Sequence, residues 1–257
     1  MNKDFYDAIY LAPHLDDVAL SCGGQVSLRC QAGESVLILT IMAGDNDKIG
    51  AGETAISAFA QSLHDRWQLA NDIIAQRRAE DITACQILGA DYQHWEIPDC
   101  IYRGEPETAA AYYNSEESLW GPIHPQENAL IEGLATRFAD LPPHKEIISP
   151  LALGNHVDHQ ITRRAAEQHF GTKLCYYEDY PYAAAVREIE LQLHSAGIIW
   201  QNKTIPLTNS ELQARCTAVA AYQSQLSTFF QDQADLTRQI NSFVEQVGGE
   251  RIWWQTK

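Results

Sequence analysis

The sequence predicts an α/β fold in which helices cover both faces of a mainly parallel sheet. Two apolar runs, Ala8–Ala12 and Ser35–Met42, are rich in branched side chains and have the length of strands buried on both faces. Between them, Asp17–Ala32 has the length of a helix, and Gly33 stands where that helix would end. Strand, helix and strand in this order form a βαβ unit with parallel strands.

The same alternation continues along the chain. Trp67–Leu88 carries apolar residues at near-helical spacing and is closed by Gly89, and a strand is expected at Gln93–Ile97. Helix, strand, helix and strand are then expected at Gln126–Ala139, Glu146–Ser149, His156–Phe170 and Lys173–Tyr177. This order of elements predicts a Rossmann-like, doubly wound sheet.

The carboxyl-terminal third is expected to complete the sheet. The pattern predicts helices at Ala183–Ala196 and Asn209–Gln231, an edge strand at Lys203–Ile205 and a terminal strand at Arg251–Trp254. Two long irregular segments, 43–65 and 98–125, interrupt the alternation, and loops of this length in compact folds are usually functional or mobile. We expect both loops to border the binding site.

The composition limits the classes of function. With 257 residues, of which 45% are hydrophobic and 20% charged, the chain is expected to fold as a single domain over residues 1–257. The 34 acidic and 18 basic side chains give a formal charge of −16, which repels nucleic acid and anionic lipid surfaces. A small neutral or polar ligand is therefore favoured over nucleic acid, while the oligomeric state is not predicted.

Cysteine usage and hydropathy indicate the compartment. The six cysteines are scattered without CxxC pairs, so we expect them to be reduced core residues. The amino terminus lacks the apolar core of a signal peptide, and no run of about 18 apolar residues is present to span a membrane. These features predict a cytoplasmic protein without a membrane span.

The first chemical motif follows the first predicted strand directly. Residues 13–17 read Pro-His-Leu-Asp-Asp, and ligands of open parallel sheets bind at the carboxyl ends of strands. An imidazole beside two adjacent carboxylates is costly through repulsion unless a cation joins them. The alternative is a helix N-cap, in which Asp16 or Asp17 accepts backbone N–H bonds and His14 has no role.

The second motif stands in the same relation to a later strand. Residues 155–159 read Asn-His-Val-Asp-His, and His156 and His159 share a helix face because they are three residues apart. Taken alone, this motif is better explained by two surface histidines with Asp158 as a cap. Convergence of both motifs on one point, however, would give the mixed nitrogen and oxygen ligand set that suits zinc. Catalytic zinc needs three protein ligands, and these two motifs offer five candidates.

The two motifs together resemble the PIG-L/LmbE-like zinc deacetylases, which remove acetyl groups from N-acetylglucosamine-containing substrates and related amides. The family's motifs, His-Pro-Asp-Asp-Glu and His-x-Asp-His, correspond to residues 14–18, where Leu15 and Val18 depart from the pattern, and to residues 156–159. The resemblance implies that His14, Asp17 and His159 ligate zinc, with Fe²⁺ as a possible cellular substitute. It further implies that Asp16 is the general base, that His156 stabilises the oxyanion, and that Asp158 orients a histidine.

Weaker similarities extend the resemblance to residues 8–226. Residues 77–80 and 221–225 match family segments, and in relatives an arginine at the position of Arg77 lies near the acyl group of the substrate. A helix-surface charge paired with Glu80 is the alternative for this arginine. Tyr180 is expected either to line the pocket as a sugar-binding aromatic or to pack in the core. Val18 replaces the family's glutamate, which leaves the chemistry intact and places the sugar specificity in doubt.

The predicted function is hydrolysis of an acetamide on an N-acetylglucosamine-type sugar or glycoconjugate, which releases acetate and a free amine. Three alternatives remain. The substrate is an amide with a larger acyl group, the protein is a metal-dependent carbohydrate-binding module without catalysis, or it is a nucleotide-binding module. The pair of aspartates argues against the second, because binding alone does not need Asp16. The lack of a Gly-x-Gly-x-x-Gly loop after the first strand argues against the third.

Overall fold

The computed structural model describes residues 3–44, 56–67, 73–105, 108, 110–185, 189, 193 and 198–256. At its centre lies a seven-stranded sheet with the order β3-β2-β1-β4-β5-β7-β6. The first five strands in this order are parallel, and β7 and β6 run antiparallel to their neighbours. The strands are β1 (Tyr6–Ala12), β2 (Val36–Thr40), β3 (Asp91–His94), β4 (His144–Pro150), β5 (Leu174–Tyr177), β6 (Ile199–Ile205) and β7 (Glu250–Thr256). The predicted mainly parallel, doubly wound sheet is confirmed.

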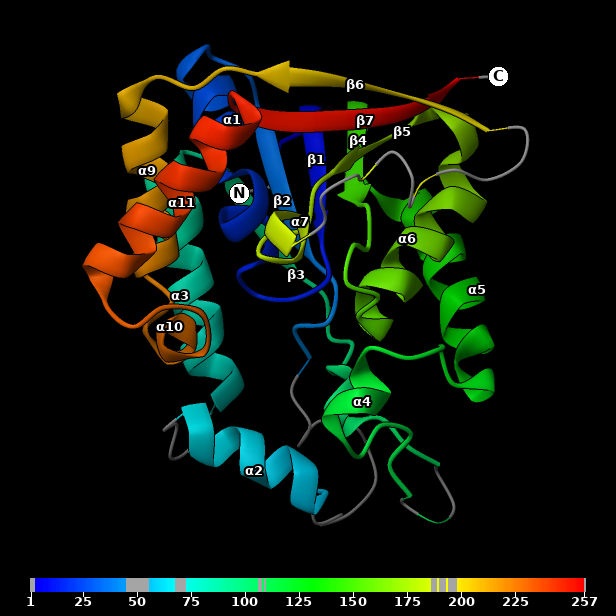
Figure 1. The fold of residues 1–257 in the computed structure, drawn as a ribbon. Coiled ribbons are helices and arrows are strands. Elements are labelled where there is room, and N and C mark those ends of the chain that lie inside the picture. The colour runs from blue at the N-terminus through cyan, green and yellow to red at the C-terminus, as the bar shows by residue number, and fades with distance from the viewer. Residues whose placement is uncertain are drawn as a thin grey trace.

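Helices cover both faces of this sheet (Figure 1). One layer contains α1 (Asp17–Gln31), α3 (Ile73–Leu88), α9 (Asn209–Ala220) and α11 (Gln233–Val247), which pack on one another. The other layer contains α5 (Asn128–Arg137) and α6 (Val157–Phe170). The shorter helices are α2 (Ala58–Trp67), α4 (Glu116–Leu119), α7 (Tyr182–Ala185) and α10 (Gln223–Phe229). Figure 1 shows α2 and α4 together at one end of the sheet.

The strand order explains where a site can form. The chain leaves β1 for β2 and β3 on one side and later returns to β4 and β5 on the other, so β1 and β4 are neighbours at the point where the order reverses. Tyr10 pairs with Ile148, which brings the carboxyl ends of the two strands level. Open α/β sheets bind ligands in the crevice at this switch point. Both predicted motifs follow these two strands.

Three expected helices differ from the observed ones. The expected helix over 67–88 is replaced by α2, which ends at Trp67, and α3, which begins at Ile73; the residues between lie outside those described. Residues 58–65 are thus helical, although they belong to the predicted loop 43–65. Of the expected helix over 183–196, the structure describes α7 and two isolated helical positions. The predicted strand at 93–97 lies earlier, at 91–94.

The expected helix over 209–231 divides into α9 and α10 because long-range bonds hold the chain between them. Tyr222 leaves the helical conformation and donates its hydroxyl proton to Asp81 of α3, at 2.7 Å. Two residues later, the backbone N–H and the hydroxyl of Ser224 both donate to the carboxylate of Glu80. Two segments that resemble family patterns therefore contact each other. The sequence pattern did not predict α11, which packs on α9.

Two simpler expectations can be compared with the structure. All six cysteines are free, and four of them are buried. No helix among the described residues combines the length and the apolar character needed to cross a membrane.

Candidate metal-dependent active site

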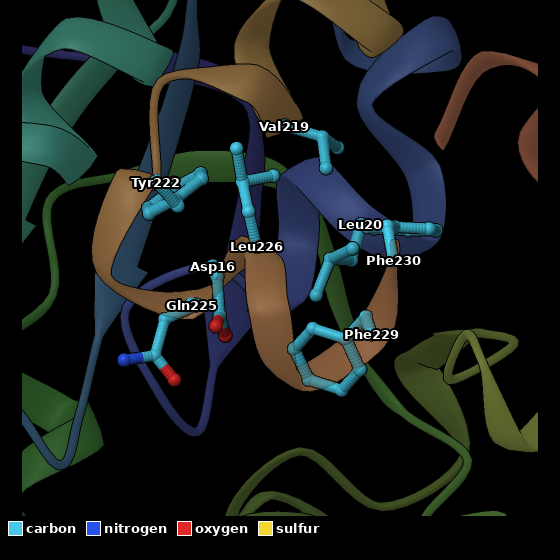
Figure 2. A pocket seen from close by; sticks show the side chains of 8 residues that line it. All are labelled: Asp16, Leu20, Val219, Tyr222, Gln225, Leu226, Phe229 and Phe230. Atoms are coloured by element: carbon cyan, nitrogen blue, oxygen red, sulfur yellow. The ribbon is translucent and has the colours of Figure 1, made fainter. Parts of the chain in front are cut away.

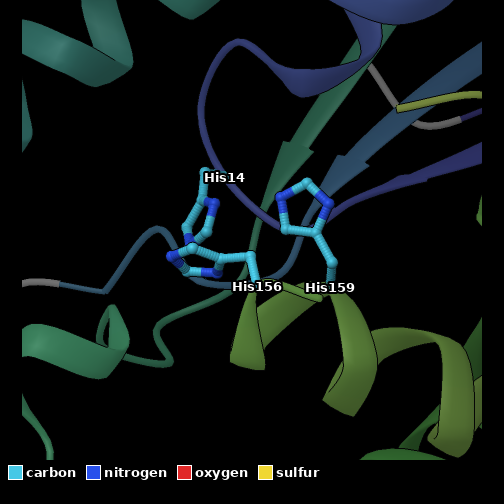
Figure 3. Close-up of side chains that lie close together, drawn as sticks. All are labelled: His14, His156 and His159. Carbon is cyan, nitrogen blue, oxygen red and sulfur yellow. The ribbon is translucent and has the colours of Figure 1, made fainter. Parts of the chain in front are cut away.

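The histidines of the two motifs meet at the carboxyl ends of β1 and β4 (Figure 3). His14 lies in the loop after β1, His156 is the N-cap of α6, and His159 belongs to the first turn of that helix. The ring of His14 lies 4.9 Å from the ring of His156 and 5.5 Å from that of His159, centroid to centroid. The two motifs, 142 positions apart from His14 to His156, therefore form one cluster, as their placement after neighbouring strands suggested.

The carboxylate of Asp17 lies between two of these histidines. Its Oδ2 atom is 3.4 Å from Nδ1 of His14, and its Oδ1 atom is 3.3 Å from Nε2 of His159. Asp17 also accepts a hydrogen bond from the backbone N–H of His14 at 2.7 Å, which fixes the loop around the carboxylate. One oxygen-bearing and two nitrogen-bearing side chains thus face one another at short range.

The far nitrogen of each histidine contacts a buried carboxylate. Nε2 of His14 lies 2.9 Å from Oδ2 of Asp158, and Nδ1 of His159 lies 2.6 Å from Oδ1 of Asp179. Both aspartates are fully buried. Pairing a histidine with a carboxylate fixes the ring orientation and directs the other nitrogen's lone pair inward, the arrangement that metal-ligating histidines have. Asp158 was predicted to orient a histidine, whereas no role was predicted for Asp179.

This donor set fits a zinc ion. Nδ1 of His14, a carboxylate oxygen of Asp17 and Nε2 of His159 are the nitrogen and oxygen donors of a three-ligand zinc site, and the remaining nitrogens are already bonded elsewhere. His14, His156 and His159 also have one nitrogen each within 4.8 Å of one another. We favour Asp17 over His156 as the third donor, because Nδ1 of His156 accepts a bond from the backbone of Asp158.

Burial and charge shift the pKa values of the groups in this cluster. Burial lowers the pKa of His14, but the negative charges of Asp99, Asp158 and Asp17 outweigh it and raise the pKa well above its usual range. Burial likewise opposes protonation of His159, while Asp17 and Asp179 raise its pKa to about 10. The buried carboxylates therefore favour positive charge at the histidine cluster, and a divalent cation would supply it.

Asp16 differs from its neighbour Asp17 in backbone and in environment. Its φ angle of 134° lies in a region that residues with a side chain rarely adopt, and such strain is concentrated at functional positions. Burial, followed by the charge of Asp17, raises the pKa of Asp16 to about 8, whereas the nearby histidines hold the pKa of Asp17 far below its usual range.

The helix-cap alternative for these aspartates is not supported. Asp16 is the N-cap residue of α1, but its side chain makes no capping hydrogen bond. Asp17 accepts from the backbone of His14, outside the helix, and faces His159. Neither carboxylate therefore serves mainly to stabilise the helix.

His156 caps α6 and stands beside the other two histidines. Its Nδ1 atom accepts a bond from the backbone N–H of Asp158 at 3.3 Å, so the neutral ring carries its proton on Nε2. Burial, then the positive charges of His14 and His159, lower the pKa of His156 to about 3. A neutral imidazole with a fixed N–H donor is thus available at the edge of the cluster.

An ion-pair network ties the second predicted loop to the site. Arg103 donates to Oδ1 of Asp158 and makes two bonds to Glu127, and all three side chains are buried. Tyr113 donates its hydroxyl proton to the same glutamate. Asp99 lies 3.7 Å from Nε2 of His14. The loop 98–125 therefore borders the site, as expected. Of the first loop, residues 45–55 lie outside the described residues.

The two predicted substrate contacts occupy different surroundings. Arg77 is buried and lies 3.5 Å from the carbonyl oxygen of Leu15, and its positive charge offsets part of the rise in the pKa of Asp16. The alternative, in which Arg77 is a charge on the helix surface, is therefore not supported. Tyr180 is also buried, and its ring packs 5.2 Å from that of Phe243 on α11. Tyr180 therefore packs in the core, which was the alternative to lining the pocket.

The other tyrosine of the Tyr-Pro-Tyr segment lies at the cluster instead. The ring of Tyr182 is 6.1 Å from that of His159, edge to face. Gly154 makes room for it, since a Cβ at this glycine would stand 2.7 Å from Cγ of Tyr182. Val18, which replaces the family's glutamate, is 1% exposed and belongs to the main apolar core.

A small apolar pocket opens to solvent beside Asp16 (Figure 2). Leu20 of α1 forms one wall, and Leu226, Phe229 and Phe230 form the other. Figure 2 shows the carboxylate of Asp16 directed toward this space. The pocket was not predicted, because its walls come from segments about 200 residues apart.

Known proteins are similar to this chain in sequence. A family profile described as GlcNAc-PI de-N-acetylase (PIG-L) matches residues 9–170. The chain is 27% identical to a 2'-N-acetylparomamine deacetylase of Niallia circulans, over 99% of this chain and 93% of that protein.

Solved structures of similar proteins share the fold over nearly the whole chain. The zinc-inhibited form of teicoplanin deacetylase Orf2 has a TM-score of 0.78 and 25% identity, and the match covers 96% of this chain and 97% of that one. The A40926 pseudoaglycone deacetylase Dbv21 has a TM-score of 0.72 and 26% identity, with 98% and 97% covered.

Proposed function

This chain belongs to the PIG-L family of GlcNAc-PI de-N-acetylases, and from this premise we propose that it is a zinc-dependent deacetylase of N-acetylated sugars or glycoconjugates. The observation that carries the proposal is the cluster of His14, Asp17 and His159, in which each histidine is held by a buried carboxylate. The deacetylase relatives support the reaction class, and the acetylated sugar-type compounds in their names support the substrate class.

In the proposed site, His14, Asp17 and His159 hold the zinc ion, which Fe²⁺ could replace. When bound, the ion supplies Lewis acidity to the amide carbonyl and to water. Asp158 and Asp179 keep the two histidine rings in the orientation that directs a lone pair inward.

Asp16 is proposed as the general base. Its strained backbone places the carboxylate beside the cluster without a helix-capping bond, so it remains available to accept a proton. A pKa raised to about 8 by burial makes it a stronger base than an ordinary carboxylate. The attacking water adds to the amide carbon as its proton passes to Asp16. Cleavage of the C–N bond then releases acetate, and the amine takes up a proton.

His156 is proposed to stabilise the negative charge that develops on the amide oxygen. Its backbone-bonded Nδ1 leaves Nε2 as the donor, and the ring need not be charged to donate. Arg77 interacts with Asp16 through its positive charge and lies 3.5 Å from the backbone carbonyl oxygen of Leu15. We therefore propose that it helps to position the general base and does not contact the substrate.

A panel of N-acetylated substrates tests this function. N-acetylglucosamine, N-acetylated aminoglycosides and an N-acetylated glycopeptide aglycone are incubated with the purified protein, and released acetate is measured together with bound metal. We expect acetate from at least one sugar substrate and about one zinc or iron per chain. Protein that stays metal-free when zinc is supplied, or that binds zinc and releases no acetate from any member, contradicts the proposal.

A second candidate substrate is an amide with an acyl group larger than acetyl. The pocket beside Asp16 favours it, because apolar side chains line the space next to the proposed base. Each buried methylene contributes about 0.8 kcal/mol, so affinity should rise about fourfold per carbon if the chain enters the pocket. The two substrate classes are distinguished by measuring kcat/KM for the acetyl, propionyl, butyryl and hexanoyl derivatives of one amine. A kcat/KM that falls with the length of the acyl chain supports the acetyl substrate, and one that rises supports the larger acyl group.

A further inference from the structure

Trp120 presents an exposed aromatic surface at the edge of the histidine cluster. It follows α4, and 38% of the residue is exposed. Its ring lies 4.9 Å from the ring of His156, edge to face. Among the large apolar side chains that are exposed in the described part of the chain, Trp120 is the one with a ring contact to this cluster. Burying the rest of the indole would remove apolar surface from water.

The position of this indole is fixed by the site itself. The next residue, Gly121, accepts a hydrogen bond through its carbonyl oxygen from the side-chain amide of Gln160 at 2.8 Å. Gln160 belongs to α6 and follows His159 directly. On its other side, the ring of Trp120 lies 5.2 Å from that of Tyr182. The residue next to the indole is therefore bonded to α6, the helix that His156 caps and that carries His159.

Ser115 and Ser118 hold the short helix before the tryptophan. Their side chains form a capping box, in which each bonds to the backbone N–H of the other. Because the turn is bonded both to its own helix and to α6, little conformational entropy remains to be lost when a ligand covers the indole.

We propose that Trp120 is the stacking platform for the sugar ring that carries the scissile amide; this inference rests on the proposed deacetylase function. A pyranose has a face of C–H groups, which packs on an aromatic surface, and hydroxyl groups at its rim, which stay hydrated. An indole beside His156 stands next to the group that faces the amide oxygen, so a sugar stacked on it presents its N-acyl substituent to the cluster. Amino groups on the same ring system add a cation–π attraction.

Equilibrium binding provides a test that does not depend on turnover. An Asp16→Asn protein, purified with its metal, is titrated with N-acetylglucosamine and with 2'-N-acetylparomamine, and saturation transfer to the sugar protons is recorded by NMR. In this background, Trp120→Ala should weaken binding about tenfold and remove transfer to one face of the ring. Trp120→Phe keeps a smaller platform, so it should weaken binding roughly threefold at most.

A matched control separates stacking from general damage. Phe5 is 48% exposed and directly precedes β1, at the amino end of this strand, whereas the site lies at its carboxyl end. Phe5→Ala should therefore bind both sugars as the parent does. In the otherwise unaltered enzyme, Trp120→Ala should raise KM for the sugar substrate about tenfold and change kcat less than threefold. Equal metal content and melting temperature of the variants exclude unfolding as the cause.

The outcomes distinguish this inference from the proposed function. Binding that is unchanged by Trp120→Ala, or weakened equally by Phe5→Ala, overturns the platform, as does a parent protein that binds neither sugar. A fall in kcat at unchanged KM also overturns it, because the indole would then act only through His156. If binding depends on Trp120 but the wild-type enzyme releases no acetate, the platform stands and the deacetylase function fails.

Discussion

Asp16 and Asp17 are adjacent and identical in type, yet the fold gives them opposite properties. Asp17 faces two histidines, which favour its charged form, whereas Asp16 is buried beside an apolar pocket with Asp17's charge nearby, which disfavours ionisation. Two carboxylates with separated pKa values are typical of a pair with divided roles. The contacts of each side chain therefore distinguish the proposed metal ligand, Asp17, from the proposed base, Asp16.

The division of roles predicts different losses from substitution of the two aspartates. Asp17→Ala or His159→Ala removes one of three proposed ligands, so metal content and turnover should fall together. Asp16→Asn keeps the size of the side chain but cannot accept a proton, so metal should be retained while kcat falls roughly 10²- to 10⁴-fold. Metal analysis and steady-state kinetics of each variant check this. Wild-type turnover by the Asp16→Asn protein would remove Asp16 from the mechanism.

His156 should behave as a donor and not as a ligand. His156→Ala is expected to keep the metal and to lose roughly 10²- to 10³-fold in kcat, the usual effect of removing one oxyanion donor. The same two measurements decide the point. Loss of metal in proportion to activity would instead support the alternative ligand group of three histidines.

Asp179 is the residue at the site that the motifs did not indicate by role. Its Oδ1 atom bonds Nδ1 of His159, and its Oδ2 atom accepts from the backbone N–H of Leu153 at 3.1 Å. Asp179→Asn removes the negative charge behind the histidine and places an amide donor near one of these partners. Metal affinity should fall roughly 10- to 100-fold.

Competition with a zinc-binding dye measures this affinity. Asp235→Asn, at the start of α11 and outside the site, is the control, and its zinc affinity should equal that of the wild type. Equal affinity in the Asp179 variant would mean that the bond to His159 does not support metal binding.

At the scale of elements, the helix that follows the first motif is held by a residue from the end of the chain. α1 is interrupted at Cys22, whose φ of −146° is not helical. The backbone N–H groups of Gly24 and Gln25 donate to the carboxylate of Glu250 on β7, at 3.1 and 2.7 Å. Arg215 of α9 donates to the same carboxylate at 3.0 Å. Glu250 thus joins α1, α9 and β7.

Breaking this buried ion pair should destabilise the whole fold. Arg215 is 0% and Glu250 2% exposed, so Glu250→Ala leaves a buried guanidinium and two backbone donors without their shared partner. The free energy of unfolding should fall by about 3 to 5 kcal/mol. Urea denaturation followed by circular dichroism measures it.

The exposed pair of Arg66 and Glu116 supplies the matched control. Its side chains are 52% and 59% exposed, and Glu116→Ala should cost about 1 kcal/mol or less. Similar losses in both variants would show that the buried pair does not hold the three elements together.

At the scale of the whole molecule, the net charge of −16 should favour substrates with free amino groups. Charge interactions over several ångströms are screened by salt, since the Debye length is about 10 Å at 0.1 M. For an N-acetylated aminoglycoside with ammonium groups, kcat/KM should therefore fall roughly threefold or more as NaCl rises from about 0.05 to 0.5 M. For neutral N-acetylglucosamine, kcat/KM should hardly change over the same range of NaCl. Equal salt dependence of both substrates would exclude electrostatic steering.

The sequence by itself determined the mainly parallel, doubly wound sheet and the position of the candidate site. Apolar runs such as Ser35–Met42 and the helical spacing within 17–32 are local patterns, and local patterns follow from burial of a repeated face. The two His/Asp motifs stand directly after strands, and the resemblance to PIG-L proteins is carried by these short segments, which the family profile confirmed.

Only the tertiary structure decided which distant side chains complete the site. Asp179 on His159, Arg103 on Asp158 and Trp120 beside His156 are contacts between residues 20 to 55 positions apart, or between separate elements, and no local period encodes them. The same holds for the two tyrosines beside Pro181. Only packing decides that Tyr182 lies at the cluster while Tyr180 lies in the core. Residue type and spacing specify the chemistry that is available, while the meeting of chain segments in the folded core specifies which groups perform it.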